Sequence, residues 1–248
     1  MKILAICNQK GGVGKTTLTI NLGAGLQITG LRVLLVDLDP QGSLTRWTGC
    51  GDPQITINDV LQGAARIRSA VLQNPAGFDV LPADIGLTES TANGEPGALK
   101  RALRGLDYDY ILIDCPPSLS ALTTAALTAA DEVIIPMTGE SSALDAAAAL
   151  VLTITAVKRR LNPRLTVSGC VFGKFSRPGR VAREVLQHTK AHFPVYDATI
   201  RTNNALDAAQ ANGQDIFTYN RKSNGAADFA ALTVEFLQKE GITGNGKD

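Results

Sequence analysis

A short stretch near the start of the chain combines residue types that hold phosphate groups. Residues 11–17 read GGVGKTT, so a lysine and two threonines directly follow closely spaced glycines. Glycines let the backbone pass close to phosphate oxygens and turn its N–H groups toward them. We predict that Lys15 reaches the β- and γ-phosphates of a nucleoside triphosphate, that Thr16 binds Mg²⁺ and that Thr17 meets the α-phosphate. The rest of the cradle is formed by Gly11, Gly12, Val13 and Gly14.

Three acidic residues at the ends of apolar runs are candidates for the metal site and for catalysis. Asp114 closes the run YILID, where it reads as a Walker B carboxylate that holds Mg²⁺ through water. Asp37 and Asp39 lie in VDLDPQG, at the end of another apolar run. We predict that Asp39 positions the attacking water and, together with Asp37, supports the metal shell. Asp37 has a simpler alternative, because a buried aspartate at a strand end also caps the helix that follows.

The phosphate-binding stretch needs a strand before it and a helix after it, and the sequence supplies both. Residues 2–7 form a short apolar run, and residues 16–30 carry apolar side chains at helical spacing. Further apolar runs predict strands at 32–39, 78–82, 108–117, 131–137, 164–175 and 195–200. Helical patterns predict later helices at 141–160, 178–191, 203–212 and 225–240. This alternation predicts an α/β fold of the P-loop NTPase type, a mostly parallel twisted sheet with helices on both faces.

Composition restricts the class of protein and the possible partners. The chain has 248 residues and a net charge of +1, so overall charge indicates no nucleic-acid partner and any basic surface must be local. The four cysteines form no CxxC pair, which suggests a reducing compartment. The start lacks a signal-peptide pattern, and no apolar run is long enough to span a bilayer. We expect a cytosolic protein with one domain over residues 1–248, a surface loop at 86–97 and a disordered tail at 241–248.

Three segments together resemble the deviant Walker A ATPases of the ParA/MinD group. They are KGGVGKTT at 10–17, LLVDLDPQGSLT at 34–45 and YDYILIDCPPSL at 108–119. The resemblance implies that Lys10, which a phosphate loop does not itself need, is the signature lysine of the group. That lysine crosses the interface of an ATP-bound sandwich dimer and contacts the other subunit's phosphates, completing charge stabilisation in trans. The resemblance also implies that Asp39 is the hydrolytic acid and that ATP and Mg²⁺ are the cofactors.

Within this group the sequence is more similar to ParA than to MinD. MinD needs a basic amphipathic C-terminal helix that lies on the membrane. This chain ends in FLQKEGITGNGKD, so we expect no membrane binding. The nitrogenase iron-protein branch is not expected, because Cys115 does not match the place of cluster-ligating cysteines. The sequence begins at its first strand, so we expect a small ParA without an N-terminal helix-turn-helix domain.

The C-terminal third follows the family pattern less closely. LDAAQANGQDI matches the family's L-x-x-A-x-x-x-G pattern through Leu206, Ala209 and Gly213. YNRKSNGA resembles the segment YDPRSxGA that helps to hold adenine, which implies adenine contacts at Tyr219 and Asn220. Asn220 stands where the family has aspartate, and the family's IPRN segment reads TIRTN here. The arginine that contacts DNA in the family therefore has no clear counterpart.

Basic residues are nevertheless dense in the C-terminal third. We predict that they form a patch that grips DNA phosphates without reading the bases. The alternative is a solvated helix face with paired charges. The residues concerned are Lys174, Arg177, Arg180, Arg183, Lys190, Arg201, Arg221 and Lys222.

The resemblance implies an ATPase that positions cargo. We expect ATP to join two subunits, the homodimer to coat nucleoid DNA nonspecifically, and a ParB-like or cargo-adaptor protein to stimulate an otherwise slow hydrolysis. This cycle would segregate plasmid or chromosome DNA. The main alternative is the same cycle with a protein cargo, such as carboxysomes or chemoreceptor clusters. A MinD-like membrane-surface regulator and a metabolic amidoligase related to dethiobiotin synthetase are further alternatives.

Overall fold

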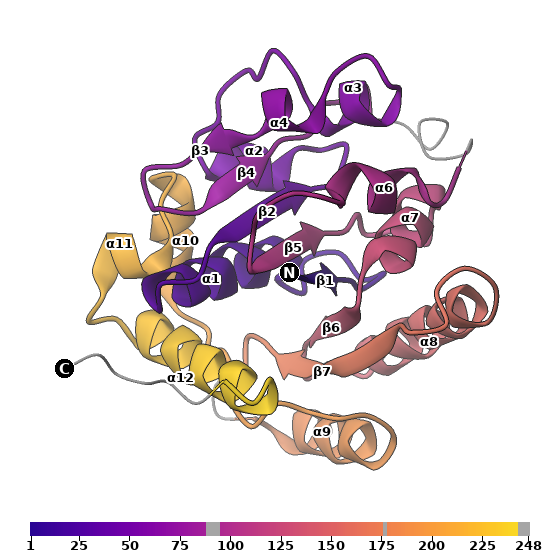
Figure 1. Cartoon of the computed structure of the whole chain (residues 1–248). Helices are drawn as coiled ribbons and strands as arrows, with labels where there is room; N and C mark the ends of the chain where they lie inside the picture. The colour runs from indigo at the N-terminus through magenta and orange to yellow at the C-terminus, as the bar shows by residue number, and fades with distance from the viewer. Residues whose placement is uncertain (88–94, 176–177, 243–248) are drawn as a thin grey trace.

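A seven-stranded sheet forms the centre of the computed structural model, which describes residues 1–87, 95–175 and 178–242 (Figure 1). The strands are β1 (Lys2–Ile6), β2 (Val33–Asp37), β3 (Leu72–Gln73), β4 (Asp79–Leu81), β5 (Tyr110–Asp114), β6 (Glu132–Met137) and β7 (Thr166–Phe172). Their order across the sheet is β3-β4-β2-β5-β1-β6-β7. All neighbouring pairs are parallel except the short edge pair of β3 and β4. The predicted fold class is therefore confirmed.

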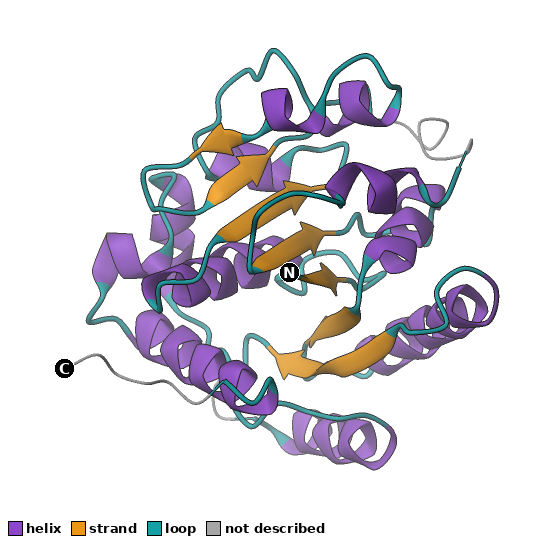
Figure 2. Cartoon of the chain, viewed as in Figure 1, coloured by secondary structure: helices purple, strands orange, loops and turns teal. Residues whose placement is uncertain are grey.

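Helices cover both faces of this sheet (Figure 2). They are α1 (Lys15–Ile28), α2 (Ser43–Trp47), α3 (Ile57–Leu61), α4 (Ile67–Ala70), α6 (Ala98–Leu103), α7 (Ala121–Ala129), α8 (Ser142–Arg160), α9 (Arg180–His192), α10 (Asn204–Ala211), α11 (Ile216–Asn220) and α12 (Asn224–Lys239). Within the described residues, none of these helices combines the length and the apolar character needed to cross a membrane.

The core consists of two apolar layers, one on each face of the sheet. Successive strand residues point to opposite faces. Leu4 and Ile6 therefore pack in the layer that includes α1 and α12. Ile3 and Ala5 pack in the layer that includes α7 and α8. Because both faces are covered, the central strands are apolar along most of their length, with charged residues only at strand ends, instead of alternating with polar residues.

Helix α1 is wedged between the sheet and α12. A Cβ atom on Gly25 would lie 2.2 Å from Thr233 Oγ1, so only glycine allows the two helices to approach this closely. Asn21 links α1 to α11, since its Oδ1 accepts a hydrogen bond of 2.7 Å from the backbone N–H of Ile216. The helix that begins at the phosphate loop is therefore fixed along its length.

The register of the central strands brings three strand ends together. Asp37 at the end of β2 pairs with Asp114 at the end of β5, and Asp114 pairs with Ile6 at the end of β1. In parallel sheets, ligands bind beyond the carboxyl ends of the strands. The predicted phosphate loop and the predicted acids therefore share one edge of the sheet.

One predicted strand is wrong. Residues 195–200 make only two isolated bridges to the β7 region, between Cys170 and Val195 and between Gly173 and Ile200. Between these bridges, the backbone N–H groups of Asp197 and Ala198 donate to the carboxylate of Glu235 instead of to β7. Strand β3 was not predicted. Most of the loop predicted at 86–97 and of the tail predicted at 241–248 lies outside the described residues.

Candidate nucleotide-binding site

The loop between β1 and α1 presents open backbone at the carboxyl edge of the sheet. Gly14, the N-cap of α1, has φ 92°, a left-handed conformation that favours glycine. No side chain caps the helix at this position, so its first-turn N–H groups have no acceptor from an N-cap side chain. A Cβ atom placed on Gly11 or Gly12 would meet nothing within 4 Å. This open helix N-terminus is suited to an anion.

The side-chain ammonium group of Lys15 lies beside this loop. Its side chain is buried, and its Nζ donates a long hydrogen bond of 3.4 Å to the carbonyl oxygen of Lys10. Among the described residues, no carboxylate lies within ion-pair distance of Lys15. A buried ammonium group needs a compensating negative charge. A phosphate on the loop would supply it.

Thr16 and Asp114 form the polar centre of the site. Thr16 Oγ1 donates a hydrogen bond of 2.6 Å to Asp114 Oδ2. Asp114 is only 1% exposed, and its Oδ1 has no hydrogen-bond partner among the described residues. Burial raises the pKa of Asp114 well above its usual range, and the nearby Asp37 raises it further. The orphaned oxygen is a potential ligand for a bound cation.

These donors fit magnesium. Hydroxyl and carboxylate oxygens are the ligands that Mg²⁺ prefers, and Mg²⁺ takes most of its other ligands from water and substrate phosphates. In the described part of the chain, no group of three or more histidine, cysteine or acidic side chains is arranged to hold a metal ion without further ligands. A metal here would therefore arrive with the nucleotide, held by Thr16 and Asp114.

Asp37 caps helix α2. It is fully buried, and its Oδ2 accepts hydrogen bonds from the backbone N–H and the hydroxyl of Thr45, at 2.9 and 2.8 Å. Its Oδ1 accepts from the backbone N–H of Asp39 at 3.1 Å. Burial raises the pKa of Asp37 to about 6. The structure thus gives Asp37 the capping role that the sequence left as an alternative, and its support of a metal shell stays a prediction.

Asp39 lies just beyond β2, half-buried, where a water molecule could approach it. Its Oδ1 accepts a hydrogen bond of 3.0 Å from the backbone N–H of Gln41. Its Oδ2 forms no hydrogen bond with any residue in the described ranges. One carboxylate oxygen is therefore fixed and the other is available. This geometry suits the predicted role in positioning water.

Lys10 is bound within its own chain. Its ammonium group forms an ion pair with Glu140 and donates a hydrogen bond of 2.7 Å to Ser142 Oγ. Both partners lie just after β6, which neighbours β1 in the sheet. Sequence reasoning missed Glu140 and Ser142. Their signal was an acid and hydroxyl residues directly after a predicted strand.

A cavity of about 310 Å³ adjoins the phosphate loop at Gly14 and Thr17. Much of its wall is apolar, with polar groups among the remaining lining residues. The apolar part includes Val13, Leu18, Val171, Ile200, Leu206 and Phe229. The polar part includes Lys174, Arg201, Thr202, Asn203 and Asp207. A pocket with an apolar wall and a few polar groups suits a base and a sugar.

The two residues predicted to contact adenine do not line this cavity. Tyr219 and Asn220 are on α11, and neither lines the cavity beside the phosphate loop. Tyr219 is 37% exposed, and Asn220 uses its Oδ1 to accept from the backbone N–H of Lys222. Residues from the segment 200–207 line the cavity instead. In the sequence, the segment TIRTN at 199–203, noted only as a departure from the family pattern, was the available indication that this part of the chain lies beside the phosphate loop.

The predicted DNA-contacting residues fall into two groups. Three are engaged with carboxylates: Arg180 with Glu184, Lys190 with Asp197 and Arg201 with Asp228. Four others are exposed and form no ion pair with a described residue: Lys174, Arg183, Arg221 and Lys222. Arg177 lies outside the described residues. The predicted patch is therefore only partly available for phosphate contacts.

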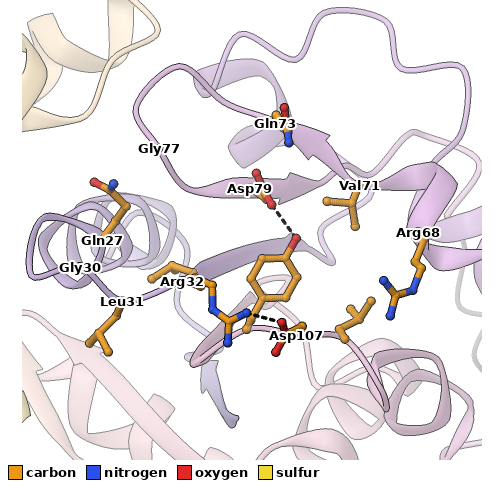
Figure 3. A pocket seen from close by; sticks show the side chains of 13 residues that line it. Gln27, Gly30, Leu31, Arg32, Arg68, Val71, Gln73, Gly77, Asp79 and Asp107 are labelled. Carbon is orange, nitrogen blue, oxygen red and sulfur yellow. Dashed lines mark hydrogen bonds and ion pairs between the residues drawn. The ribbon is translucent and has the colours of Figure 1, made fainter.

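A second cavity, of about 510 Å³, lies at the opposite edge of the sheet (Figure 3). Two of its polar contacts link side chains that line it. Tyr108 donates a hydrogen bond of 2.6 Å to Asp79, and Arg32 forms an ion pair with Asp107. None of the predicted nucleotide-binding residues lines it. It is distinct from the candidate site.

Comparison with known proteins places these features in a family. The family described as "AAA domain" matches residues 1–167. The chromosome partitioning protein ParA of Caulobacter vibrioides is 39% identical, over 97% of this chain and 95% of its own length. The similarity therefore includes the phosphate loop, the acidic strand ends and the C-terminal third.

Two solved structures share the fold. The MinD protein of Pyrococcus horikoshii, complexed with Mg-ADP, has a TM-score of 0.80 and 29% identity, with 97% of this chain and 98% of that chain covered. A cobyrinic acid a,c-diamide synthase of Mycobacterium smegmatis, with a bound ATP analog and magnesium, has a TM-score of 0.77 and 37% identity, with 86% and 93% covered.

Proposed function

Since the chain belongs to the ParA family of chromosome partitioning proteins, we propose that it is a positioning ATPase. Its ATP-bound homodimer binds DNA without sequence preference, and a ParB-like or adaptor protein stimulates hydrolysis. The cargo is plasmid or chromosome DNA. The cycle places the protein in the cytoplasm, on the nucleoid.

The proposal is supported most directly by three features of the phosphate loop. The helix N-terminus above Gly14 is open, Lys15 forms no ion pair with a described residue, and Asp114 has an orphaned oxygen. Bound Mg·ATP would supply a partner to each of these three groups. The Mg-ADP of the MinD structure and the ATP analog and magnesium of the M. smegmatis structure are consistent with this ligand.

The residues take distinct roles in this proposal. Lys15 and the loop N–H groups hold the β- and γ-phosphates, while Thr16 and Asp114 hold Mg²⁺, which neutralises phosphate charge when bound. Asp39 positions the attacking water. Lys10 leaves Glu140 and contacts the phosphates of the second subunit. Hydrolysis is slow until the stimulating protein completes this arrangement.

An ATPase assay tests the proposal. We expect slow turnover by the protein alone and faster turnover with DNA and the protein encoded by the adjacent gene. Lys15→Ala should abolish Mg²⁺-dependent ATP binding in a calorimetric titration. An amidoligase would instead turn over ATP only with a small acceptor. Unchanged ATP affinity of Lys15→Ala, or turnover that needs such an acceptor, contradicts the proposal.

A further inference from the structure

The end of α8 and the turn that follows it carry four exposed cations. Lys158, Arg159 and Arg160 form the last three residues of the helix, and Arg164 lies in the turn before β7. None of these four side chains forms an ion pair or hydrogen bond with another residue in the described ranges. We call these four residues the α8 cation cluster. Three members of the predicted DNA-contacting set, in contrast, are bound to carboxylates.

The acids next to the α8 cation cluster are already engaged. Asp131 and Glu132 lie at the start of β6, and Glu132 pairs in register with Thr166 at the start of β7. Asp131 Oδ2 accepts a hydrogen bond of 2.8 Å from the backbone N–H of Ile3. Glu132 forms an ion pair of 2.8 Å with Lys2. Neither carboxylate therefore forms an ion pair with the cluster.

The turn that carries the cluster is firmly anchored. Asn162 is 4% exposed, and its Nδ2 donates to the carbonyl oxygens of Leu127 and Ala130, at 3.0 and 2.6 Å. The backbone N–H groups of Leu161 and Asn162 both donate to the carbonyl oxygen of Val157. Charged side chains on a fixed element lose less freedom when they bind a ligand. The backbone that carries Arg164 is thus fixed.

Helix stabilisation explains only part of the cluster. Cations in the last turn of a helix interact favourably with its dipole. This interaction explains why residues 158–160 are basic. It does not account for Arg164, which lies beyond the helix and beyond Pro163. Nor does it account for the lack of any acidic partner among the described residues.

We propose that the α8 cation cluster is a contact surface for the phosphate backbone of double-stranded DNA. This inference rests on the proposed function and adds the surface that makes the contact. Three of the four cations are arginines, whose guanidinium groups bind phosphate through two parallel hydrogen bonds. The cluster precedes β7, so it lies at the edge of the sheet opposite the phosphate loop. DNA bound there leaves the nucleotide-binding edge unobstructed.

The test measures the affinity of the ATP-loaded full-length protein for a DNA duplex of random sequence. The affinity is measured at several salt concentrations between 50 and 200 mM, because phosphate contacts weaken strongly over this range. One variant replaces all four cluster cations with glutamine. The control variant replaces Arg66, Lys100, Arg101 and Arg104 with glutamine and so removes the same charge elsewhere. Nucleotide affinity and thermal melting check that both variants fold.

We expect the cluster variant to lose at least tenfold in DNA affinity at 100 mM salt. The log–log salt slope should become shallower by roughly three to four, because each phosphate contact contributes about 0.9. The control variant should keep most of its affinity. If the cluster variant does not fold, Arg164→Gln alone should still reduce the slope by about one, since Arg164 lies outside the helix.

The outcomes separate this inference from the proposed function. If the unsubstituted protein binds no DNA in any nucleotide state, the proposed function fails and the inference fails with it. If the unsubstituted protein binds DNA and the cluster variant binds equally well, only the inference fails. Equal losses in both variants overturn it too, because net charge would then explain the effect. If the cluster variant binds DNA normally but no longer binds anionic phospholipid vesicles that the unsubstituted protein binds, the cluster contacts a membrane surface and the DNA assignment is overturned.

Discussion

The ammonium group of Lys10 is paired with the carboxylate of Glu140 in the same chain, and Ser142 accepts a second hydrogen bond from it. A lysine held in this way must leave both partners before it contacts the phosphates of another subunit. The proposed dimerisation therefore competes with an intramolecular contact. This competition makes the dimer sensitive to substitutions at residue 140.

Glu140→Gln should strengthen ATP-dependent dimerisation. The Glu140 side chain is 66% exposed, and exposed ion pairs contribute little, so we expect a modest increase in dimer affinity even though one pair breaks in each subunit. Sedimentation velocity with ATP measures the dimer fraction. Glu184→Gln, which breaks the exposed pair with Arg180, is the matched control and should change nothing. A weaker dimer in Glu140→Gln would show that this carboxylate supports the dimer.

Asp39→Ala should retain ATP binding and lose hydrolysis. The phosphate cradle does not depend on this side chain, whereas the available carboxylate oxygen is removed. We expect turnover to fall by about a hundredfold or more, in the range typical of a lost general base or water-positioning group. ATP should then hold the protein as a dimer that remains on DNA longer than the unsubstituted protein. Normal turnover in this variant would exclude Asp39 from catalysis.

Filling the cavity beside the phosphate loop should weaken nucleotide binding more than changing the predicted adenine residues. We expect Leu206→Trp to reduce ATP and ADP affinity by at least about tenfold, equivalent to ~1.4 kcal/mol. Tyr219→Ala should change either affinity by less than about threefold, since Tyr219 does not line the cavity. Inorganic triphosphate, which has no base, should bind the Leu206→Trp variant normally. If Tyr219→Ala weakened nucleotide binding more than Leu206→Trp, the adenine contact would lie on α11, as the sequence predicts.

Arg201→Ala should reduce the free energy of unfolding. Its guanidinium group bonds the carboxylate of Asp228, which is 9% exposed, and this contact ties the segment before α10 to α12. Loss of this partner leaves a mostly buried carboxylate with fewer hydrogen bonds, and the backbone N–H of Arg201, which still donates to Asp228, limits the loss of stability. Urea denaturation measures the change. Unchanged stability would leave Arg201 available as a DNA contact.

The sequence could predict which elements bring the candidate nucleotide-binding residues together, because those residues lie in short local motifs. Residues 11–17 and Asp114 carry their chemistry in a strand, a turn and the start of a helix, and these elements are readable from spacing. The contact between Lys10 and Glu140 is different. It joins residues 130 positions apart, and it exists because β6 pairs with β1. Nothing in either local pattern indicates that strand order.

The wrong strand at 195–200 and the unforeseen ion pair of Arg201 have a related cause. Residues 195–200 have strand-like composition, but Glu235 on α12 takes the hydrogen bonds that a neighbouring strand would need. Arg201 looked like a free cation until the fold placed Asp228 beside it. In each case a distant residue on α12 decided the outcome. Local patterns cannot reveal such competition.

Trp47 gives the molecule an optical reporter of its own. It is the only tryptophan in the chain, it is 4% exposed, and its indole N–H donates a hydrogen bond of 2.9 Å to the carbonyl oxygen of Gln214. It also ends α2, the helix that Asp37 caps next to Asp39. Any rearrangement of the segment around Asp39 therefore changes the surroundings of one buried indole. Its intrinsic fluorescence can follow the segment around Asp39 in real time without a label.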